Sequence, residues 1–279
     1  MPKISIITIN YNNADGLRKT IESVKAQNFS DLEYIVIDGG SSDQSVEIIK
    51  EYDGYISKWV SEKDNGIYNA LNKGIKIATG EYLLFLNSGD HFYNKNVLTN
   101  NLEYIDIYDI IVFDIHFSGF GKDYIFKHPD ELHFSFLFEE TFAHQSVFIK
   151  RNLFKKIGLY DETLKIVSDW KFFINAIASG ATYKCVHNVL SSFYFGGVSS
   201  TAEGTRIRKE EREKVLKNEF SLYYTDYLRL RNYNRTLETN RFRMLTEIEK
   251  SKRGKKVFSL ILRTYIFLFS KEKLKNILK

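Results

Sequence analysis

A polar tetrapeptide, Asn87 to Asp90, follows a short apolar run that begins at Tyr82, and together they read YLLFLNSGD. Such a run is typical of a strand buried on both faces. Open α/β sheets bind ligands beyond the carboxyl ends of their strands, and a carboxylate there can hold a hard cation against a diphosphate. Asn87 and Asp90 are the candidates for this chemistry. The alternative is a plain turn, because Asn, Ser, Gly and Asp are common turn residues.

Three other polar positions come at or just after expected strands. They are the segment 8–12 (TINYN), Asp38 before GGSSD, and Asp64 within SEKDNG. Each has a structural alternative as a helix cap or a turn. Four such positions along one sheet edge favour a nucleotide site, because carboxylates and amides accept from base N–H and ribose hydroxyl groups, and glycine lets the backbone come close.

Glycine-rich phosphate loops are missing from the sequence. No G-x-G-x-x-G follows the first expected strand, no G-x-x-x-x-G-K-[ST] is present, and the pair Gly119 and Gly121 lacks a third glycine at the required spacing. A nucleotide held through a metal-bound diphosphate is therefore favoured. The sequence also lacks a G-x-S-x-G motif and a Cys/His cluster, which argues against a serine hydrolase and a zinc enzyme.

These positions are separated by elements that alternate between strand and helix. Short apolar runs predict the strands, and apolar residues at 3.6-residue spacing predict the helices. The expected strands are 3–9, 32–37, 55–60 and 81–86, and the expected helices are 14–27, 43–51 and 65–79. This order predicts an α/β fold with a Rossmann-like, mostly parallel sheet that is flanked by helices.

The pattern is less regular beyond residue 108. We expect strands at 109–113, 144–149, 183–187 and 190–195, a hairpin region at 119–128, and helices at 152–157 and 169–179. After residue 200 the sequence becomes charged, and residues 205–250 contain neither Pro nor Gly, which favours helices. We therefore expect one domain at 1–203 and a helical, basic C-terminal extension at 204–279.

The charge distribution sets the C-terminal residues apart. Residues 251–279 contain nine Lys or Arg and one Glu, a net charge of +8, which leaves −3 for residues 1–250 out of a total of +5. A basic tail indicates an anionic partner. The apolar stretch 257–269 is shorter than the roughly 20 residues of a membrane span. Its basic flanks favour peripheral contact with an anionic membrane, with a core-packing or oligomer-forming helix as the alternative.

Cysteine content and the chain start bear on the compartment. The single Cys185 excludes an intrachain disulfide, and the chain enters a strand without a basic and apolar leader. We expect a cytoplasmic protein that lies peripherally at the inner face of the plasma membrane. No nucleic-acid partner is expected, because basic and aromatic residues do not interleave on a recognisable module. The helical stretch after Thr205 favours a homo-oligomer as a further option.

Four ordered motifs resemble those of the family 2 glycosyltransferases of GT-A fold. They are TINYNN, IDGGSSD, SEKDNGIYNALNKGI and FLNSGD, within about residues 3–200. The resemblance is closest to bacterial enzymes that build capsule, O-antigen and exopolysaccharide. It implies an inverting transfer from a nucleotide-diphosphate sugar, with a UDP-sugar favoured, to a hydroxyl of a glycan or lipid-linked acceptor. It also implies Mn²⁺ or Mg²⁺ as the cofactor.

The resemblance assigns donor-side roles position by position. Asp90 matches the metal ligand of the D-x-D motif, but Asn87 stands in place of the first acid and Asp90 lies three positions after it. The remaining donor-side residues are Thr8, Asn10, Tyr11, Asp38, Asp64, Lys73, Asn87 and Ser88.

Asp169 matches the catalytic base of the family, in a segment where Ser168 replaces the usual Glu. As a base it would take the proton of an acceptor hydroxyl while that oxygen attacks the anomeric carbon. An inverting displacement needs only this carboxylate, whereas a retaining one needs a second. A helix N-cap is the alternative for Asp169. The resemblance places four residues on the acceptor side: His144, Gln145, Trp170 and Gly197.

Two other functions are alternatives to this one. A sugar-phosphate nucleotidyltransferase would need a glycine-rich, basic loop where this chain has NYNNADG. A degenerate GT-A domain that serves as a membrane-docked binding or assembly protein is favoured by Asn87 and Ser168, and disfavoured by Asp90 and Asp169. The sequence does not separate a hexosyltransferase from an N-acetylhexosaminyltransferase.

Overall fold

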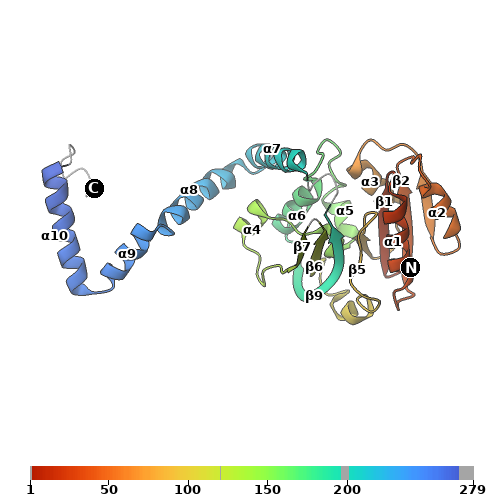
Figure 1. Ribbon diagram of the computed structural model, residues 1–279, viewed down its shortest axis with the longest axis horizontal. Coiled ribbons are helices and arrows are strands. Elements are labelled where there is room, and N and C mark those ends of the chain that lie inside the picture. Colours follow the sequence, from red (N-terminus) through yellow and green to blue (C-terminus); the bar gives the residue numbers. More distant parts are fainter. Residues whose placement is uncertain (1, 120, 196–200, 270–279) are drawn as a thin grey trace. The chain divides into compact units, whose positions relative to one another are not determined.

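The computed structural model describes residues 2–119, 121–195 and 201–269 (Figure 1). The chain divides into two compact units, Met1–Val215 and Leu216–Lys279. Helix α7 (Ala202–Glu219) runs across the boundary expected between residues 203 and 204, and that boundary stays a prediction.

The first half of the sheet shows the regular alternation that the sequence predicts. It contains β1 (Ile4–Asn10), α1 (Ala14–Lys25), β2 (Leu32–Asp38), α2 (Ser45–Glu51), β3 (Lys58–Ser61), α3 (Ile67–Ile77) and β4 (Tyr82–Phe85). Strands β3, β2, β1 and β4 lie side by side in that order, and each neighbouring pair is parallel. The carboxyl ends of β1, β2 and β4 therefore meet at one edge, where the polar segments begin.

Helices pack on both faces of these strands (Figure 1). Leu17 of α1 and Ile48 of α2 share a buried cluster with Ile4 of β1. Helix α3 lies so close to β1 that a Cβ at Gly74 would come 2.5 Å from Cγ2 of Ile7. The missing side chain at Gly74 thus permits the close approach of this helix to the sheet.

The second half extends the sheet with mixed strand directions. Its elements are β5 (His91–Phe92), η1 (Thr99–Tyr104), β6 (Ile110–Gly119), β7 (Lys122–Phe126), α4 (Phe134–Glu139), η2 (His144–Ser146), β8 (Val147–Lys150), α5 (Asn152–Lys156), α6 (Ser168–Ala178) and β9 (Tyr183–Tyr194). The order continues from β4 through β8, β6 and β9 to β5, and β7 pairs with β6. Strand β8 is antiparallel to β4 and β6, whereas β9 is parallel to β6.

Two details of this half differ from the sequence-based expectation. The strands expected at 183–187 and 190–195 form one strand, β9, whose register against β6 shifts on either side of Asp114. The strand expected at 144–149 begins as the short 3₁₀ turn η2, so His144 lies outside the ladder. Both features depend on pairing with neighbouring strands, which local periodicity does not report.

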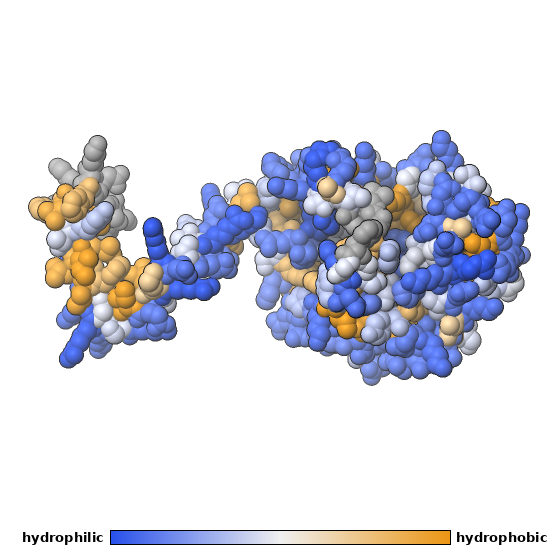
Figure 2. All heavy atoms as spheres, in the orientation of Figure 1, coloured by the Kyte–Doolittle hydropathy of each residue, from blue (hydrophilic) through white to orange (hydrophobic). Residues whose placement is uncertain are grey.

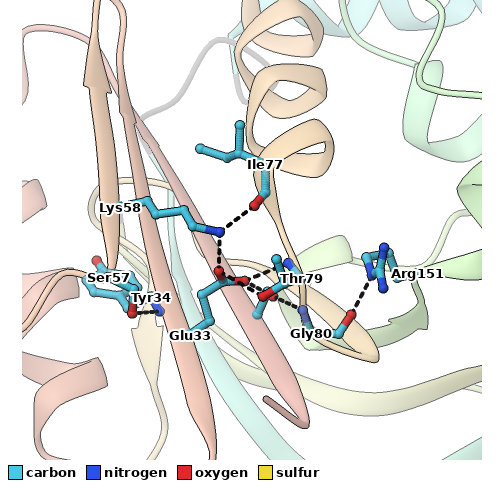
Figure 3. A network of polar contacts seen from close by, with 9 residues as sticks. Glu33, Tyr34, Ser57, Lys58, Ile77, Thr79, Gly80 and Arg151 are labelled. Carbon is cyan, nitrogen blue, oxygen red and sulfur yellow. Dashed lines mark hydrogen bonds and ion pairs between the residues drawn. The ribbon is translucent and has the colours of Figure 1, made fainter. Parts of the chain in front are cut away.

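A buried carboxylate, Glu33, lies near the amino-terminal ends of the parallel strands and bonds to side chains from several of the surrounding segments (Figure 3). Its Oε1 accepts from Nζ of Lys58 at 2.7 Å and from the Thr79 hydroxyl at 3.0 Å. Its Oε2 accepts from the Ser5 hydroxyl at 2.6 Å and from the Thr79 N–H at 2.7 Å. Burial raises the pKa of Glu33, but these donors outweigh burial and hold it below the usual range.

Three further helices follow α7: α8 (Ser221–Leu237), α9 (Asn240–Glu249) and α10 (Lys252–Phe269). Helix α10 begins with basic residues, and apolar side chains gather on its surface (Figure 2). The exposed ones are Val257, Leu260, Ile261, Leu262, Tyr265, Phe267, Leu268 and Phe269. Within the described ranges, no helix combines the length and apolar character that a membrane span requires.

Candidate active site

A hydrogen-bonded chain of side chains joins the ends of β2 and β1 to the loop after β4. Asn10, the last residue of β1, donates from Nδ2 to Oδ1 of Asp38 at 2.8 Å. The Oδ1 of Asn10 accepts from the Ser88 hydroxyl at 2.7 Å. The parallel register pairs Asn10 with Asp38. Three predicted donor-side residues from separate strand ends thus form one connected group.

Asp38 is fully buried within this group. It also accepts from the hydroxyl and the N–H of Ser41, at 2.6 and 3.0 Å, and from the Ser61 hydroxyl at 2.7 Å. Burial raises the pKa of Asp38, but the donors hold it below the usual range. Thr8 is buried too, and its hydroxyl accepts from Tyr34 at 3.1 Å. Both side chains are engaged within the protein, and their contact with a donor stays a prediction.

Asp64 and Tyr11 both lie close to Gly39. A Cβ at Gly39 would come 3.0 Å from Oδ2 of Asp64 and 3.2 Å from the ring of Tyr11. Glycine therefore lets the two loops approach each other. Nζ of Lys73 pairs with Oδ1 of Asp64 at 2.6 Å. The Tyr11 ring is 69% exposed, so it offers a flat surface on which a base can stack.

Asp90 is buried, yet one of its oxygens lacks a partner. The residue is 4% exposed, and Oδ2 forms no hydrogen bond with the described part of the chain. Oδ1 of Asn87, in the same loop, is also buried without a partner there. Burial raises the pKa of Asp90 to about 7, because the charge of His144 and a hydrogen bond from Gln145 offset only part of the lost hydration.

Two unpaired buried oxygens on one loop fit a hard divalent cation, which prefers oxygen ligands. Across residues 2–119, 121–195 and 201–269, no group of three His, Cys, Asp or Glu side chains is arranged to hold a metal by itself. The residues present therefore fit a cation that takes most of its ligands from a bound diphosphate and from water. Asp90 would be the protein's charged ligand, with Asn87 beside it.

Asp169 lies in the first turn of α6 with its side chain 14% exposed. Its Oδ2 is 3.1 Å from Nδ1 of His144, and its Oδ1 is 2.9 Å from the Tyr68 hydroxyl. Burial raises the pKa of Asp169, but these hydrogen bonds outweigh burial and bring it below the usual range. Val167 occupies the N-cap position, so Asp169 is not the cap of this helix.

His144 connects Asp169 to the loop that carries Asp90. Its Nε2 lies 3.3 Å from Nδ2 of Asn87, on the ring edge opposite the bond to Asp169. The tautomer of the ring sets which nitrogen donates and which accepts. His144 therefore lies between the proposed base and the loop that carries Asn87.

A pocket of about 800 Å³ contains a second group of side chains, the one around Asp90, His144 and Asp169. The predicted site residues that line it are Asn87, Ser88, Asp90, His144, Gln145, Asp169 and Trp170. The other donor-side residues, Thr8, Asn10, Tyr11, Asp38, Asp64 and Lys73, do not line it. Ser88 belongs to the pocket and is bonded to Asn10, so it links the two groups. Gly197 lies outside the described residues.

The pocket also contains residues that the sequence analysis does not predict, among them Tyr68, Arg208 and Arg212. Tyr68 stands inside the DNGIYNALNKGI stretch, where its place at the start of a helix was an available signal. The arginines lie four residues apart, a spacing that puts them on one helical face. Nothing in their charged surroundings indicates which face meets the catalytic residues.

Residues 5–167 match the family model described as Glycosyl transferase family 2. The chain is 33% identical over 216 residues to an uncharacterised glycosyltransferase of Mycobacterium tuberculosis, which covers 74% of this chain and 80% of the relative. It is 30% identical over 213 residues to a PGL/p-HBAD biosynthesis glycosyltransferase of Mycobacterium bovis, which covers 72% of this chain and 80% of the relative.

Solved structures agree with the architecture. A fragment of TarS from S. aureus in complex with UDP-GlcNAc superposes with a TM-score of 0.63 at 20% identity, over 78% of this chain and 67% of the fragment. The mannosyltransferase PcManGT from Pyrobaculum calidifontis, in complex with GDP-Man and Mn²⁺, superposes with a TM-score of 0.56 at 15% identity. The match covers 97% of this chain and 88% of PcManGT. The predicted GT-A fold is confirmed. Together with the family model and the relatives, it shows that the chain belongs to glycosyl transferase family 2.

Proposed function

We propose that the protein moves a sugar from a nucleotide-diphosphate sugar to an acceptor hydroxyl with inversion at the anomeric carbon. The observation that carries this proposal is a single pocket that contains the hydrogen-bonded carboxylate Asp169 and the carboxylate Asp90, whose Oδ2 has no partner among the described residues. An inverting displacement needs one carboxylate base. The UDP-GlcNAc and GDP-Man in the two solved structures support a nucleotide-sugar donor. Of the two, the TarS complex has the higher TM-score, which favours a UDP-sugar as the donor of this protein.

In this proposal Asp169 is the general base. It takes the proton of the acceptor hydroxyl as that oxygen bonds to the anomeric carbon and the bond to the diphosphate breaks. The hydrogen bonds from His144 and Tyr68 keep Asp169 ionised at neutral pH and fix its direction. His144, Gln145, Trp170 and Gly197 form the acceptor side.

The donor would lie along the strand ends. In this scheme Tyr11 stacks on the base, and the ion pair of Asp64 and Lys73 lies beside it. Asp38 holds Asn10 in place through the hydrogen bond between their side chains. Asp90 and Asn87 would hold Mn²⁺ or Mg²⁺, which neutralises the diphosphate that leaves. Since Asp90 is the only charged protein ligand in this scheme, we expect the cation to bind weakly without the nucleotide.

The acceptor is proposed to be a glycan or a lipid-linked sugar in surface polysaccharide or glycolipid synthesis. The relative named for PGL/p-HBAD biosynthesis supports a glycolipid context. Both a hexose and an N-acetylhexosamine fit the donor scheme. Helix α10, with basic residues before an exposed apolar surface, suits the interface of an anionic membrane. This predicts action at the inner face of the plasma membrane.

The donor proposal is tested by calorimetric titration of UDP, GDP, dTDP and CMP, each with and without Mn²⁺. We expect one nucleotide to bind in a metal-dependent way, and Asp90→Ala to abolish that dependence. If none binds, the chain is better described as a degenerate GT-A domain that serves in assembly.

The membrane proposal is tested by co-sedimentation with vesicles of phosphatidylglycerol or of phosphatidylcholine. We expect binding to the anionic vesicles alone, weakened by salt and lost when residues 252–279 are deleted. Equal binding of the deleted and full-length chains would overturn it, and would leave oligomer formation as the role of the helix.

A further inference from the structure

The residues of α7 that enter the catalytic pocket are arginines. Arg208 and Arg212 line the pocket, and Lys165 joins them from the segment before α6. On the outer surface of the same helix, Arg206 is 58% exposed and forms ion pairs with Glu203 and Glu210. One helix therefore carries a surface arginine that forms ion pairs with its neighbours, and two arginines that line the pocket.

The position of the inner face is fixed by contacts with the catalytic segment. The Glu211 carboxylate accepts from the N–H groups of Lys165 at 2.7 Å and of Ile166 at 3.0 Å. The guanidinium of Arg212 lies 5.1 Å from the ring centroid of Trp170, the residue after Asp169, and it donates to the Glu139 carbonyl. These contacts hold the arginine pair beside the proposed base.

Within the described part of the chain, no carboxylate bonds to this pair of arginines. The hydrogen bond found there for the Arg208 side chain is to the Thr205 hydroxyl, at 3.5 Å, and neither arginine forms an ion pair with a described residue. Nε of Arg212 is buried and has no acceptor among those residues. Burial lowers the pKa of Arg212, although the Asp169 carboxylate acts against this. Both arginines are half-buried; a guanidinium that is partly withdrawn from water without a bonded carboxylate is costly, and a phosphate oxyanion is the partner that its forked donors match.

The rest of the pocket indicates which phosphate this is. Phe117, Phe193 and Phe195 line the same pocket and pack together, with ring centroids 5.4 to 5.6 Å apart. Asn87 and Asp90, which are proposed to hold the cation of the donor diphosphate, line this pocket too, whereas Tyr11 and Asp64, which are proposed to hold the rest of the nucleotide, do not. A pocket lined by both cations and aromatic rings suits a molecule that joins a phosphate to an apolar chain.

We propose that Arg208 and Arg212, with Lys165, bind the phosphate of a lipid-phosphate-linked acceptor, whose apolar part lies against the phenylalanines. This assignment rests on the proposed function, because it places the acceptor in the pocket that holds Asp169.

The test is calorimetric titration of the full-length chain with geranyl diphosphate as the probe, geraniol as its uncharged counterpart, and UDP with Mn²⁺ for the donor side. Arg208→Gln and Arg212→Gln are each expected to weaken geranyl diphosphate binding about tenfold, the effect of one charge-assisted hydrogen bond. UDP binding is expected to stay within about twofold of the wild type. Arg206→Gln is the matched control on the outer face, and we expect it to behave as the wild type.

Each result leads to a decision. If the wild type binds UDP but not geranyl diphosphate, or binds it as weakly as geraniol, this inference falls and the proposed function stands. If Arg208→Gln weakens UDP as much as geranyl diphosphate, the arginines serve the donor diphosphate and the acceptor assignment is wrong. If UDP does not bind at all, the proposed function itself fails. Arg208 has one long hydrogen bond, so its variant stays informative if Arg212→Gln does not fold.

Discussion

Two buried carboxylates lie near opposite ends of the same parallel strands, and their surroundings differ. Glu33, at the start of β2, accepts four hydrogen bonds from Lys58, Ser5 and Thr79, and its pKa is lowered. Asp90, beyond the end of β4, keeps Oδ2 without a partner among the described residues, and burial raises its pKa to about 7.

The two carboxylates differ in how far the described residues satisfy them. A buried polar group without a partner costs free energy, so the incomplete oxygen of Asp90 supports its proposed role as a cation ligand, whereas Glu33 is satisfied by the chain itself. Asp169 is a third case: its oxygens are bonded to His144 and Tyr68, yet it lines the pocket. Burial alone therefore does not distinguish these three carboxylates, whereas their hydrogen-bond partners and their access to the pocket do.

The largest expected effect comes from Asp169→Asn. Removal of a general base lowers kcat by about 10²- to 10⁴-fold. UDP binding is expected to stay unchanged, because the connected side chains at the strand ends, Asn10, Asp38 and Ser88, are intact. Steady-state kinetics with the identified donor, together with calorimetry, would measure both. A variant that keeps full kcat would show that a paired pocket carboxylate is structural here, as Glu33 is.

The same acid-to-amide change at the two ends should shift stability in opposite directions. Glu33→Gln breaks an ion pair and is expected to lower the free energy of unfolding by about 2–4 kcal/mol. Asp90→Asn removes a buried charge whose lost hydration the described residues offset only in part, and it is expected to raise the free energy of unfolding by up to about 4 kcal/mol at pH 8. Urea unfolding without metal would measure both, and equal signs would break the comparison.

The pH dependence of these two variants follows from the direction of each pKa shift. Glu33 has a lowered pKa, so its stabilisation is present above the ordinary value of 4.5 and is lost as pH falls through its folded pKa. Asp90 has a raised pKa, so the folded state loses stability as pH rises from the ordinary 3.8 through about 7. The gain from Asp90→Asn should therefore vanish in acid, where the wild-type carboxyl is already neutral.

A cation at Asp90 competes with a proton. Since the pKa of Asp90 is about 7, Mn²⁺-dependent UDP binding is expected to weaken by up to about tenfold per pH unit below that value and to level off above it. Titrations between about pH 5.5 and 8.5 would show this. In Asp90→Asn the metal-dependent part should be absent at every pH, and a persistent dependence would place the cation elsewhere.

The smallest effect is expected from Tyr68→Phe. Loss of this hydroxyl removes a hydrogen bond that lowers the pKa of Asp169, so the acid limb of the kcat/KM profile should move to higher pH. At neutral pH we expect a loss below about tenfold. Tyr160→Phe is the matched control, because its buried hydroxyl has no partner in the described structure and its ring packs against Tyr68. If the pH profile of Tyr68→Phe does not move, the hydroxyl does not act on Asp169, and its role is limited to the hydrogen bond with the Ile166 carbonyl.

Much of the first half could be predicted from the sequence. The strand and helix spacing up to β4 depends on local periodicity, and parallel order brings Asn10, Asp38 and Ser88 to one edge. The second half could not be predicted at the same level, because the irregular register of β9 and the short turn at His144 arise from pairing between distant strands. Arg208 and Arg212 read as part of a charged extension, since sequence does not show where a helix docks.

Residue types and their spacing determined the fold class, the family and the identity of Asp90 and Asp169 as candidates, because these depend on local patterns within short segments. Tertiary structure alone decided which carboxylates are satisfied. Asp38 ends the buried strand β2 and Asp90 follows the buried strand β4. Serine and asparagine donors complete Asp38, while none completes Oδ2 of Asp90 among the described residues. Partners that come from distant segments determine burial, pKa and access, and these contacts form only when the chain is folded.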